Sequence, residues 1–315
     1  MYELDGYDER ILRILCDDAR QSYRDIAGSV KRSKDAVRNR VKSYEEHGVF
    51  NDFIARINQS PFVDGVLCVM VKTSEPRRCI DMITNNPCVN WASTLIGDYD
   101  IAFTYCAKTV KEAKTNIRTI LDKSFVASYR THLYTKEHKF DRGQILGDPR
   151  VTNDHASSSS VDINELDRAI LAELAMNARS SYADIAREQG VSGPTVSRRV
   201  KRLREQGVLL GFSISLRPYQ FGYETYFIGV RSCELSAEQT RTVTGMDVVT
   251  FFTESIGYYD YFIRVTVTDQ HRLQTAMNEL QSVLQYPSID LHRVVDEPKE
   301  VFVPPGVIRR DTPNQ

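Results

Sequence analysis

The segment LDRAILAELAMNARSSYADIAREQGVSGPTVSRRVKRLREQGV, residues 166–208, decides the fold because the 315-residue chain contains it in two versions. Residues 7–49, YDERILRILCDDARQSYRDIAGSVKRSKDAVRNRVKSYEEHGV, align with it without a gap and share roughly nineteen identical positions. Further along, IGDYD at 96–100 matches IGYYD at 256–260. The chain therefore consists of two related halves, and the serine-rich stretch at 147–161 has the composition of a linker between them.

The repeated segment carries the signals of three short helices. In the second half, apolar residues recur at helical spacing from Ile170 onward and predict the first helix. Ser181, followed three residues later by Asp184, has the form of a capping box at the start of the second helix. Gly190 can take the left-handed conformation that ends this helix, and Ser192 can cap the third. This order is typical of a helix-turn-helix.

The third helix indicates a nucleic-acid partner. Val196, Val200 and Leu203 fall on one side of it, while the stretch 192–204 holds five basic residues and no acid. Such a density suits contacts with phosphates and with guanine edges, although a charged helix face can also be merely solvated. The candidate DNA-contacting residues of this half are Ser192, Thr195, Ser197, Arg198, Arg199, Lys201 and Arg202.

The first half keeps the same frame with a less basic outward face. Asn39 stands where the second half has Arg198, and Asp35 adds an acid. Lys31 occupies the position of Gly190, and a non-glycine residue in the left-handed region costs roughly 1 kcal/mol. We therefore expect this half to bind DNA weakly, differently or not at all. Its candidate contacts are Lys34, Arg38, Asn39, Arg40 and Lys42.

After each helix-turn-helix the pattern changes to alternating strands and two helices in the order βαββαβ, which is ferredoxin-like. The predicted fold class is α+β, a tandem repeat of a winged or helix-turn-helix DNA-binding domain and a ferredoxin-like (RAM/ACT-like) domain. The predicted domains are 1–52 and 162–211 for the helix-turn-helix units and 53–146 and 212–315 for the ferredoxin-like units, with 147–161 as the linker.

This combination, with a GxYD turn between the central strands, resembles the leucine-responsive regulatory (Lrp/AsnC, or feast/famine) family of transcription regulators. The resemblance implies a sequence-specific regulator of double-stranded DNA that forms a dimer or higher homo-oligomer through its ferredoxin-like domains. It also implies an amino acid or other small effector beside the turn. Tandem duplication departs from the family pattern, so these domains could pair within or between chains.

The effector candidates by position are Gly97, Asp98, Tyr99, Asp100, Gly257, Tyr258, Tyr259 and Asp260. A carboxylate can pair with an ammonium group, and a glycine N–H can bind a carboxylate. The alternative is that these residues simply form β-turns between strands.

Composition limits the other functional classes. The net charge is −1, so only local clusters of Lys and Arg argue for a polyanionic partner. No stretch approaches the roughly 20 apolar residues of a spanning helix, and the amino terminus does not have the pattern of a signal peptide, so we expect a cytoplasmic protein without a membrane partner. The cysteine spacing suggests no metal site, and no sequence motif suggests a cofactor.

Two alternatives from other classes stay open. The same frame resembles the sirohaem decarboxylases, which depend on histidine and arginine side chains around the cleft. The central strands VNWASTLIGDYD and VVTFFTESIGYYDY contain neither, and His132 and His292 are expected at a sheet edge or on the surface. We therefore expect no enzyme and no catalytic residue. The other alternative is an effector-binding partner that acts without DNA.

Overall fold

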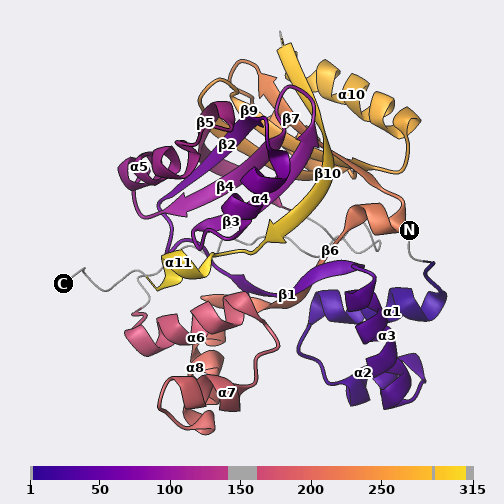
Figure 1. Ribbon diagram of the computed structural model, residues 1–315. Helices are drawn as coiled ribbons and strands as arrows, with labels where there is room; N and C mark the ends of the chain where they lie inside the picture. The colour runs from indigo at the N-terminus through magenta and orange to yellow at the C-terminus, as the bar shows by residue number, and fades with distance from the viewer. Residues whose placement is uncertain (1–2, 141–161, 286–287, 310–315) are drawn as a thin grey trace.

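The molecule consists of a β-barrel above and two three-helix units below, in the view of Figure 1. The structure is a computed structural model and describes residues 3–140, 162–285 and 288–309. The predicted linker at 147–161 lies outside the described residues. The tandem α+β fold is confirmed, since each half supplies one three-helix unit and one βαββαβ unit.

Each half begins with the three predicted helices. Ser181 accepts a hydrogen bond from the N–H of Asp184 and donates its hydroxyl to the Asp184 carboxylate at 2.5 Å, which is a variant of the predicted capping box. Gly190 and Lys31 both adopt the left-handed conformation, with φ of 63° and 55°. The helices are α1 (Gly6–Asp17), α2 (Tyr23–Val30) and α3 (Lys34–Glu46), then α6 (Glu165–Met176), α7 (Tyr182–Glu188) and α8 (Gly193–Glu205).

A two-stranded antiparallel ribbon joins the two helix-turn-helix units. β1 (Phe50–Ile57) follows α3 and pairs with β6 (Leu209–Leu216), which follows α8. Helix α1 packs against β6 and α6 packs against β1, so each unit rests on a strand of the other half. The domain boundaries predicted at 52/53 and 211/212 fall within these two strands.

Two arginines at equivalent positions tie the units together across the ribbon. Arg20 donates from Nη1 to the carbonyls of Ala178 at 2.5 Å and Ser180 at 2.9 Å. Arg179 donates from Nε to the carbonyl of Ala19 at 2.7 Å. Because each arginine reaches the corresponding turn of the other unit, the two units are related by an approximate two-fold axis.

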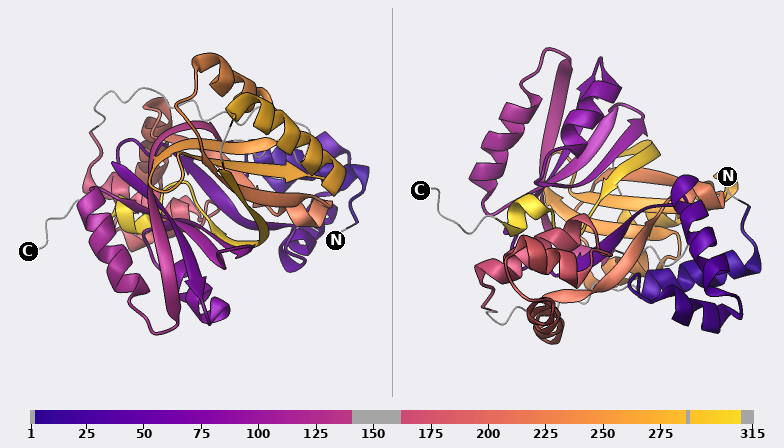
Figure 2. Two further views of the ribbon diagram at one scale, coloured as in Figure 1. Left: turned by 90° about the horizontal axis from the view of Figure 1, so that it is seen from above. Right: turned by 60° about the horizontal axis from the view of Figure 1, so that its bottom comes forward.

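The two ferredoxin-like units merge into one closed barrel with the strand order β10-β3-β4-β2-β5-β8-β9-β7. The last strand of each unit pairs with a central strand of the other, β5 with β8 and β10 with β3. Their helices cover the outside on separate sides (Figure 2). The first unit contains β2 (Gly65–Thr73), α4 (Pro76–Thr84), β3 (Val89–Ile96), β4 (Ile101–Ala107), α5 (Val110–Leu121) and β5 (Val126–Phe140). After a 3-10 turn (Pro218–Phe221), the second contains β7 (Glu224–Arg231), α9 (Ala237–Gly245), β8 (Val249–Ile256), β9 (Tyr261–Val267), α10 (Gln270–Leu284) and β10 (Ser288–Glu300).

Residues 297–308, which we call the C-terminal strap, connect the barrel to the second helix-turn-helix unit. The strap runs from the end of β10 into the short helix α11 (Pro305–Ile308), which packs against α6. Gly306 donates its N–H to the Pro87 carbonyl at 2.9 Å, and Arg168 of α6 donates to the Ile308 carbonyl at 3.2 Å. The strap therefore contacts the first ferredoxin-like unit and the second helix-turn-helix at once.

Candidate nucleic-acid interface and barrel cavity

Helix α8 presents a polar and basic face to solvent. The exposed members of the predicted set are Ser192, Ser197, Arg198 and Lys201, while Thr195 is half-buried. Within the described residues, Arg198 has no carboxylate partner, and Lys201 lies 3.8 Å from Glu205. Two cations on this face are thus available to a phosphate or a base edge.

Two other arginines of α8 turn back into their own unit. The carboxylate of Asp167 in α6 is fully buried, and Arg199 Nη1 lies 3.2 Å from both of its oxygens. Arg202 Nη2 also pairs with this carboxylate. The sequence places Arg202 on the outward face, but an unpaired buried carboxylate would cost several kcal/mol, so both guanidinium groups are drawn to it. Arg199 and Arg202 therefore hold α8 against α6.

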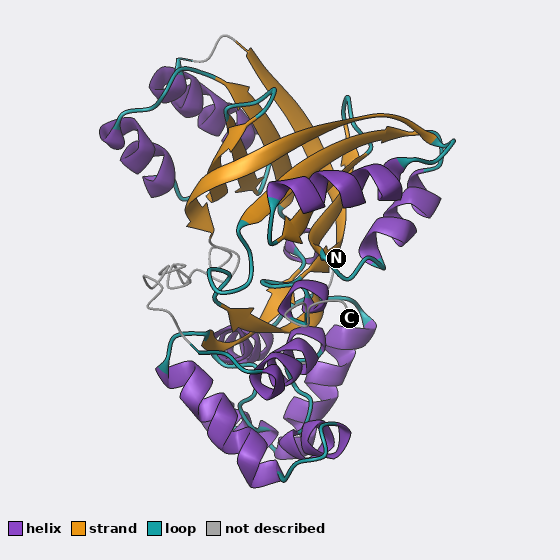
Figure 3. Ribbon diagram, turned by 90° about the vertical axis from the view of Figure 1, so that its left-hand side faces the viewer, coloured by secondary structure: helices purple, strands orange, loops and turns teal. Residues whose placement is uncertain are grey.

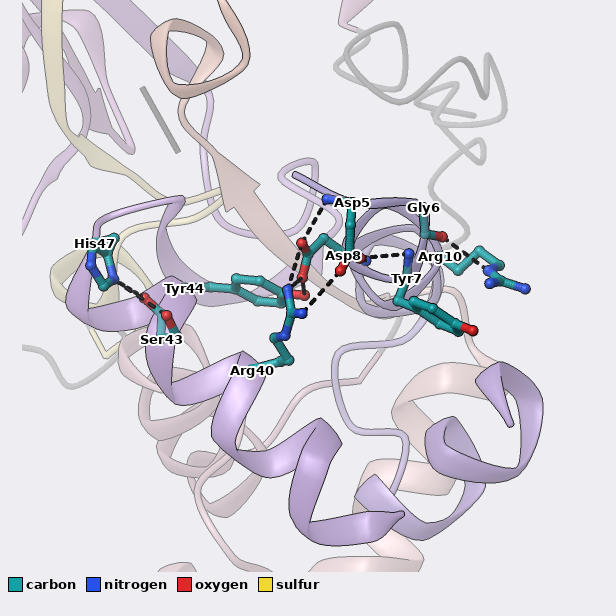
Figure 4. A network of polar contacts seen from close by, with 9 residues as sticks. All are labelled: Asp5, Gly6, Tyr7, Asp8, Arg10, Arg40, Ser43, Tyr44 and His47. Atoms are coloured by element: carbon teal, nitrogen blue, oxygen red, sulfur yellow. Dashed lines mark hydrogen bonds and ion pairs between the residues drawn. The ribbon is translucent and has the colours of Figure 1, made fainter. Parts of the chain in front are cut away.

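The first unit repeats this arrangement around Asp8, as Figure 4 shows. Arg40, the equivalent of Arg199, places Nη1 at 2.6 and 2.8 Å from the two oxygens of buried Asp8, and Tyr44 donates its hydroxyl to the same carboxylate at 2.5 Å. Arg40 Nη2 also lies 2.9 Å from Asp5, whose pKa is held below its usual value mainly by the hydrogen bond from the Asp8 N–H. Arg40, a predicted DNA contact, thus joins α3 to α1.

The outward face of α3 is partly neutralised by its own acids. The exposed candidates here are Lys34, Arg38, Asn39 and Lys42. Arg38 lies 3.1 Å from Asp35, and Lys42 lies 3.3 Å from Glu46. These surface pairs are weak, yet they leave less unmatched positive charge than the corresponding face of α8.

The predicted effector turns combine exposed and buried residues. Gly97, Asp98, Gly257, Tyr258 and Asp260 are exposed, Asp100 is half-buried, and Tyr99 and Tyr259 are buried. Asp100 accepts from the Thr73 N–H at 2.8 Å and from Lys72 Nζ at 2.9 Å. Asp260 accepts from the Ser232 N–H at 2.9 Å. Both aspartates therefore fasten their turns to a neighbouring segment, Asp100 to β2 and Asp260 to the residue that follows β7.

His132 and His292 are not at an edge or on the surface, which corrects the prediction. Each is 1% exposed, and neither ring has a hydrogen-bond partner among the described residues. Each ring lies against a turn glycine of the other unit: a Cβ at Gly257 would be 2.6 Å from His132 Cδ2, and one at Gly97 would be 2.5 Å from His292 Nδ1. His132 also stacks on Tyr259, with ring centroids 5.2 Å apart.

His132 and His292 are buried because the two ferredoxin-like units exchange strand pairings. β5 and β10 would be outer strands of separate sheets, but the closed barrel turns one face of each strand inward. Burial and, to a smaller extent, the charge of nearby Arg130 together lower the pKa of the His132 imidazole to about 4. Burial also lowers the pKa of His292. Both imidazoles are therefore neutral near pH 7.

A cavity of about 340 Å³ lies inside the barrel beside the C-terminal strap. Aromatic side chains from four strands form part of its wall, and Arg264 of β9 and Glu300 of β10 contribute buried charges. Arg264 Nη1 lies 3.2 Å from Glu297, which also accepts from Trp91 Nε1 at 2.7 Å. Sequence reasoning missed this site because it considered the two central strands, whereas Arg264 follows on the next strand.

Comparison with known proteins agrees with the duplicated architecture. The AsnC-type helix-turn-helix domain matches residues 4–45 and again residues 163–204. Regulatory protein AsnC of Escherichia coli is 32% identical over 140 residues, which cover 43% of this chain and 92% of that protein. This chain belongs to the AsnC family. The Lrp/AsnC resemblance is thereby confirmed.

A second relative supports the same assignment. An uncharacterized HTH-type transcriptional regulator of Pyrococcus horikoshii is 35% identical to the AsnC-family chain over 122 residues, covering 37% of this chain and 75% of that protein. Both relatives match about one half of the duplicated sequence. The tandem arrangement therefore distinguishes this AsnC-family chain from these single-unit relatives.

The fold of the entire AsnC-family chain is also that of an enzyme. The siroheme decarboxylase NirDL superimposes with a TM-score of 0.61, covering 95% of this chain and 94% of that chain at 14% sequence identity. At this identity the likeness shows the fold alone. It nevertheless contradicts the prediction that the chain is not an enzyme. That prediction also relied on surface histidines and on the absence of arginine, whereas His132, His292 and Arg264 are buried in the barrel.

Two absences concern residues 3–140, 162–285 and 288–309, the part of the AsnC-family chain that the structure describes. No helix in these ranges combines the length and the apolar character needed to span a bilayer. The same ranges contain no group of three or more His, Cys, Asp or Glu side chains arranged to hold a metal ion.

Proposed function

We propose that the chain is a transcription regulator that binds duplex DNA mainly through α8. The observation that carries this proposal is the exposed face of α8, where Arg198 has no carboxylate partner among the described residues. The last helix of a helix-turn-helix enters the major groove, and a guanidinium can bind both acceptors of a guanine edge. Lys201 and Ser197 flank Arg198 and suit neighbouring phosphates.

The second head of the proposed interface is α3. Both three-helix units lie on the same side of the ribbon, away from the barrel (Figure 3). Asn39 stands at the position of Arg198 and can bind an adenine edge, whereas an arginine favours guanine. The proposal therefore includes an operator with two unlike half-sites.

Three further features belong to the same proposal. The first is the division of each half into a helix-turn-helix domain followed by a ferredoxin-like domain, which meet at the ribbon strands β1 and β6. The second is a homo-oligomer formed through the ferredoxin-like domains. The third is a small effector, such as an amino acid, at the exposed turn residues Gly97, Asp98, Gly257 and Tyr258, where backbone N–H groups and a carboxylate could meet a zwitterion.

Selection of random duplex DNA by the full chain at near-physiological salt tests the proposal. We expect an enriched motif with unlike halves, and Arg198→Ala should lose the half that contains guanine. Arg241→Ala is the charge-matched control, because Arg241 is exposed on α9, outside the barrel. No enrichment with the unaltered chain would contradict the proposal.

One observation favours a second candidate function, decarboxylation of a tetrapyrrole of the sirohaem type. His132 and His292 are buried inside a chain whose fold matches a siroheme decarboxylase, and their ring nitrogens lack partners among the described residues. Decarboxylation breaks the bond between a side-chain carbon and its carboxylate, releases carbon dioxide and leaves a carbon that must take up a proton. A neutral imidazole shielded from water can relay that proton, because its N–H donates to the carbon while its other nitrogen accepts a proton in return.

Incubation of the full chain with sirohaem, followed by mass spectrometry, tests this candidate. This candidate is supported if the unaltered chain removes carbon dioxide from sirohaem and if His132→Gln or His292→Gln does not. Circular dichroism checks that each variant is folded. An unchanged sirohaem mass after prolonged incubation with the unaltered chain would contradict it.

A further inference from the structure

The two helix-turn-helix units carry the same net charge in different places. From the start of the second helix to the first residue of the third, residues 23–34 hold four basic residues and one acid, whereas the equivalent residues 182–193 hold one basic residue and two acids. Along the rest of the third helix the balance is reversed, with a net charge of zero at 35–46 and of +4 at 194–205. Both units therefore have a net charge of +3 over these 24 positions, centred on the turn in the first unit and on the third helix in the second.

The cations at the turn of the first unit form an exposed surface between α2 and α3, which we call the turn patch: Lys31, Arg32 and Lys34. Among the described residues, none of the three is paired with a carboxylate. The equivalent turn of the second unit, residues 190–193, has no charged side chain. The charge of the turn patch is therefore available to an anion outside the unit.

Lys31 adopts a backbone conformation that suits glycine better than lysine. Its φ is 55°, in the left-handed region, and the equivalent residue of the second unit is Gly190 with a φ of 63°. Residues other than glycine in this region are often found where the side chain serves binding. The lysine is thus not explained by the needs of the turn itself.

The guanidinium of Arg32 is held in position by an aromatic ring. Its Cζ lies 3.8 Å from the centroid of the Tyr7 ring, and Arg10 Cζ lies 4.7 Å from the same centroid. A guanidinium that stacks through its face leaves N–H groups at its edge, which can bind two oxygens of a phosphate. The second unit has apolar residues at all three positions, Leu166, Ala169 and Val191.

We propose that the turn patch is a phosphate clamp that holds the backbone of duplex DNA without regard to sequence, while α8 reads the bases. In a helix-turn-helix the third helix enters the groove and the second crosses the backbone, so the turn between them lies beside phosphates. Both units lie on the same side of the β1–β6 ribbon, where one duplex can meet α8 and the turn patch together (Figure 3). This inference rests on the proposed function, because it takes duplex DNA as the partner.

The double variant Lys31→Gly, Arg32→Val gives the first unit the residues of the second and tests the clamp. The affinity of the full chain for the selected duplex and for a scrambled duplex is measured between about 50 and about 200 mM salt. Each lost phosphate contact should lower the slope of log affinity against log salt by about 0.9. Across this range the unaltered chain should therefore lose about tenfold more affinity than the double variant. Both duplexes should be weakened by the same factor, since a phosphate contact carries no sequence information.

Gln285→Gly is the matched control for the backbone change. Gln285, at the end of α10 on the barrel, is the other non-glycine residue in the left-handed region among the described residues, with a φ of 46°. Its replacement should leave the DNA affinity unchanged. Because glycine suits the conformation of Lys31, the urea midpoint of Lys31→Gly should not fall, so weaker DNA binding by this variant is not the result of unfolding. If the double variant does not fold, Lys31→Gly alone carries the test, with a slope change of about 0.9.

The outcomes separate the clamp from the proposed function. A folded double variant that keeps the affinity and salt slope of the unaltered chain overturns the clamp and leaves the proposed function standing. A loss confined to the selected duplex also overturns the clamp, because it indicates that the turn patch reads bases. An unaltered chain that binds random duplexes and selects no motif contradicts the proposed function, and the variants then test the clamp on random duplexes alone. An unaltered chain that binds no duplex overturns both.

Discussion

Replacing Arg198 and Arg199 one at a time by alanine separates DNA contact from stability at two adjacent positions of α8. Arg198 is exposed, whereas Arg199 Nη1 lies 3.2 Å from both oxygens of buried Asp167. We expect Arg198→Ala to weaken DNA binding with little effect on folding. Arg199→Ala should first lower the stability of the second helix-turn-helix unit.

The structure sets the expected magnitudes. An arginine that reads a base edge contributes about 1–3 kcal/mol, which corresponds to a loss of about 5- to 150-fold in affinity. If Arg198 instead contacts a phosphate, the slope of log affinity against log salt should fall by about 1. In Arg199→Ala, Asp167 keeps its pairing with Arg202, so we expect a loss of about 1–3 kcal/mol, less than for a fully abandoned buried charge.

Fluorescence anisotropy with the selected duplex at several salt concentrations measures the first effect, and urea unfolding followed by circular dichroism measures the second. Arg241→Ala serves as the control in both assays. The reasoning is refuted if Arg198→Ala binds with the affinity and salt dependence of the unaltered chain. It is also refuted if Arg199→Ala keeps full stability.

Three further perturbations probe the rest of the fold. Arg20→Ala removes two hydrogen bonds to the other helix-turn-helix unit and should lower the stability of the contact between the units by about 1–3 kcal/mol. The loss should appear as faster amide hydrogen exchange in the β1–β6 ribbon, and an unchanged exchange rate would contradict the prediction. The pKa of His132 is about 4 in the folded state, whereas the same side chain in the unfolded chain takes up a proton near pH 6.5. The free energy of unfolding should therefore fall by up to about 3 kcal/mol as the pH is lowered from about 6.5 to 4. Urea titrations at several pH values should show this loss in the unaltered chain and not in His132→Gln. Gly257→Ala places a Cβ 2.6 Å from the His132 ring and should lower the urea midpoint by the equivalent of about 1–3 kcal/mol. Gly245→Ala is the control, because a Cβ at Gly245 has open space around it. Equal midpoints for the two variants would argue against the close approach of Gly257 to His132.

Local structure was predictable because its causes are local. Serine caps, the glycine turn and the apolar stripes predicted all six helices of the helix-turn-helix units, and Lys31 takes the left-handed conformation that its alignment with Gly190 requires. The alternation of polar and apolar residues likewise predicted both βαββαβ units. The pairing of β5 with β8 and of β10 with β3 depends on strands more than a hundred residues apart in the sequence, which no local pattern specifies. The burial of His132 and His292 follows from that pairing.

The directions of the arginines illustrate a different limit. A helical projection gives the direction in which a side chain leaves the backbone, but a guanidinium can reach back several ångströms from there. Arg199 and Arg202 do so because Asp167 is buried beneath them. One feature of the sequence could have predicted these directions. Asp8 and Asp167 occupy equivalent positions of the first helix of each unit, among the residues that face the core, and a buried acid attracts nearby arginines.

The closed barrel lies within a single chain, and this changes how the pair of DNA-reading units responds to the amount of protein. Two separate subunits must meet, so the fraction that is assembled falls on dilution. When the subunits are scarce, the number of assembled pairs is proportional to the square of the subunit concentration. Here the two units are connected covalently and face each other at a fixed effective concentration. The number of complete pairs is therefore proportional to the number of chains synthesised, and a cell that makes very few copies loses none of them to dissociation into halves.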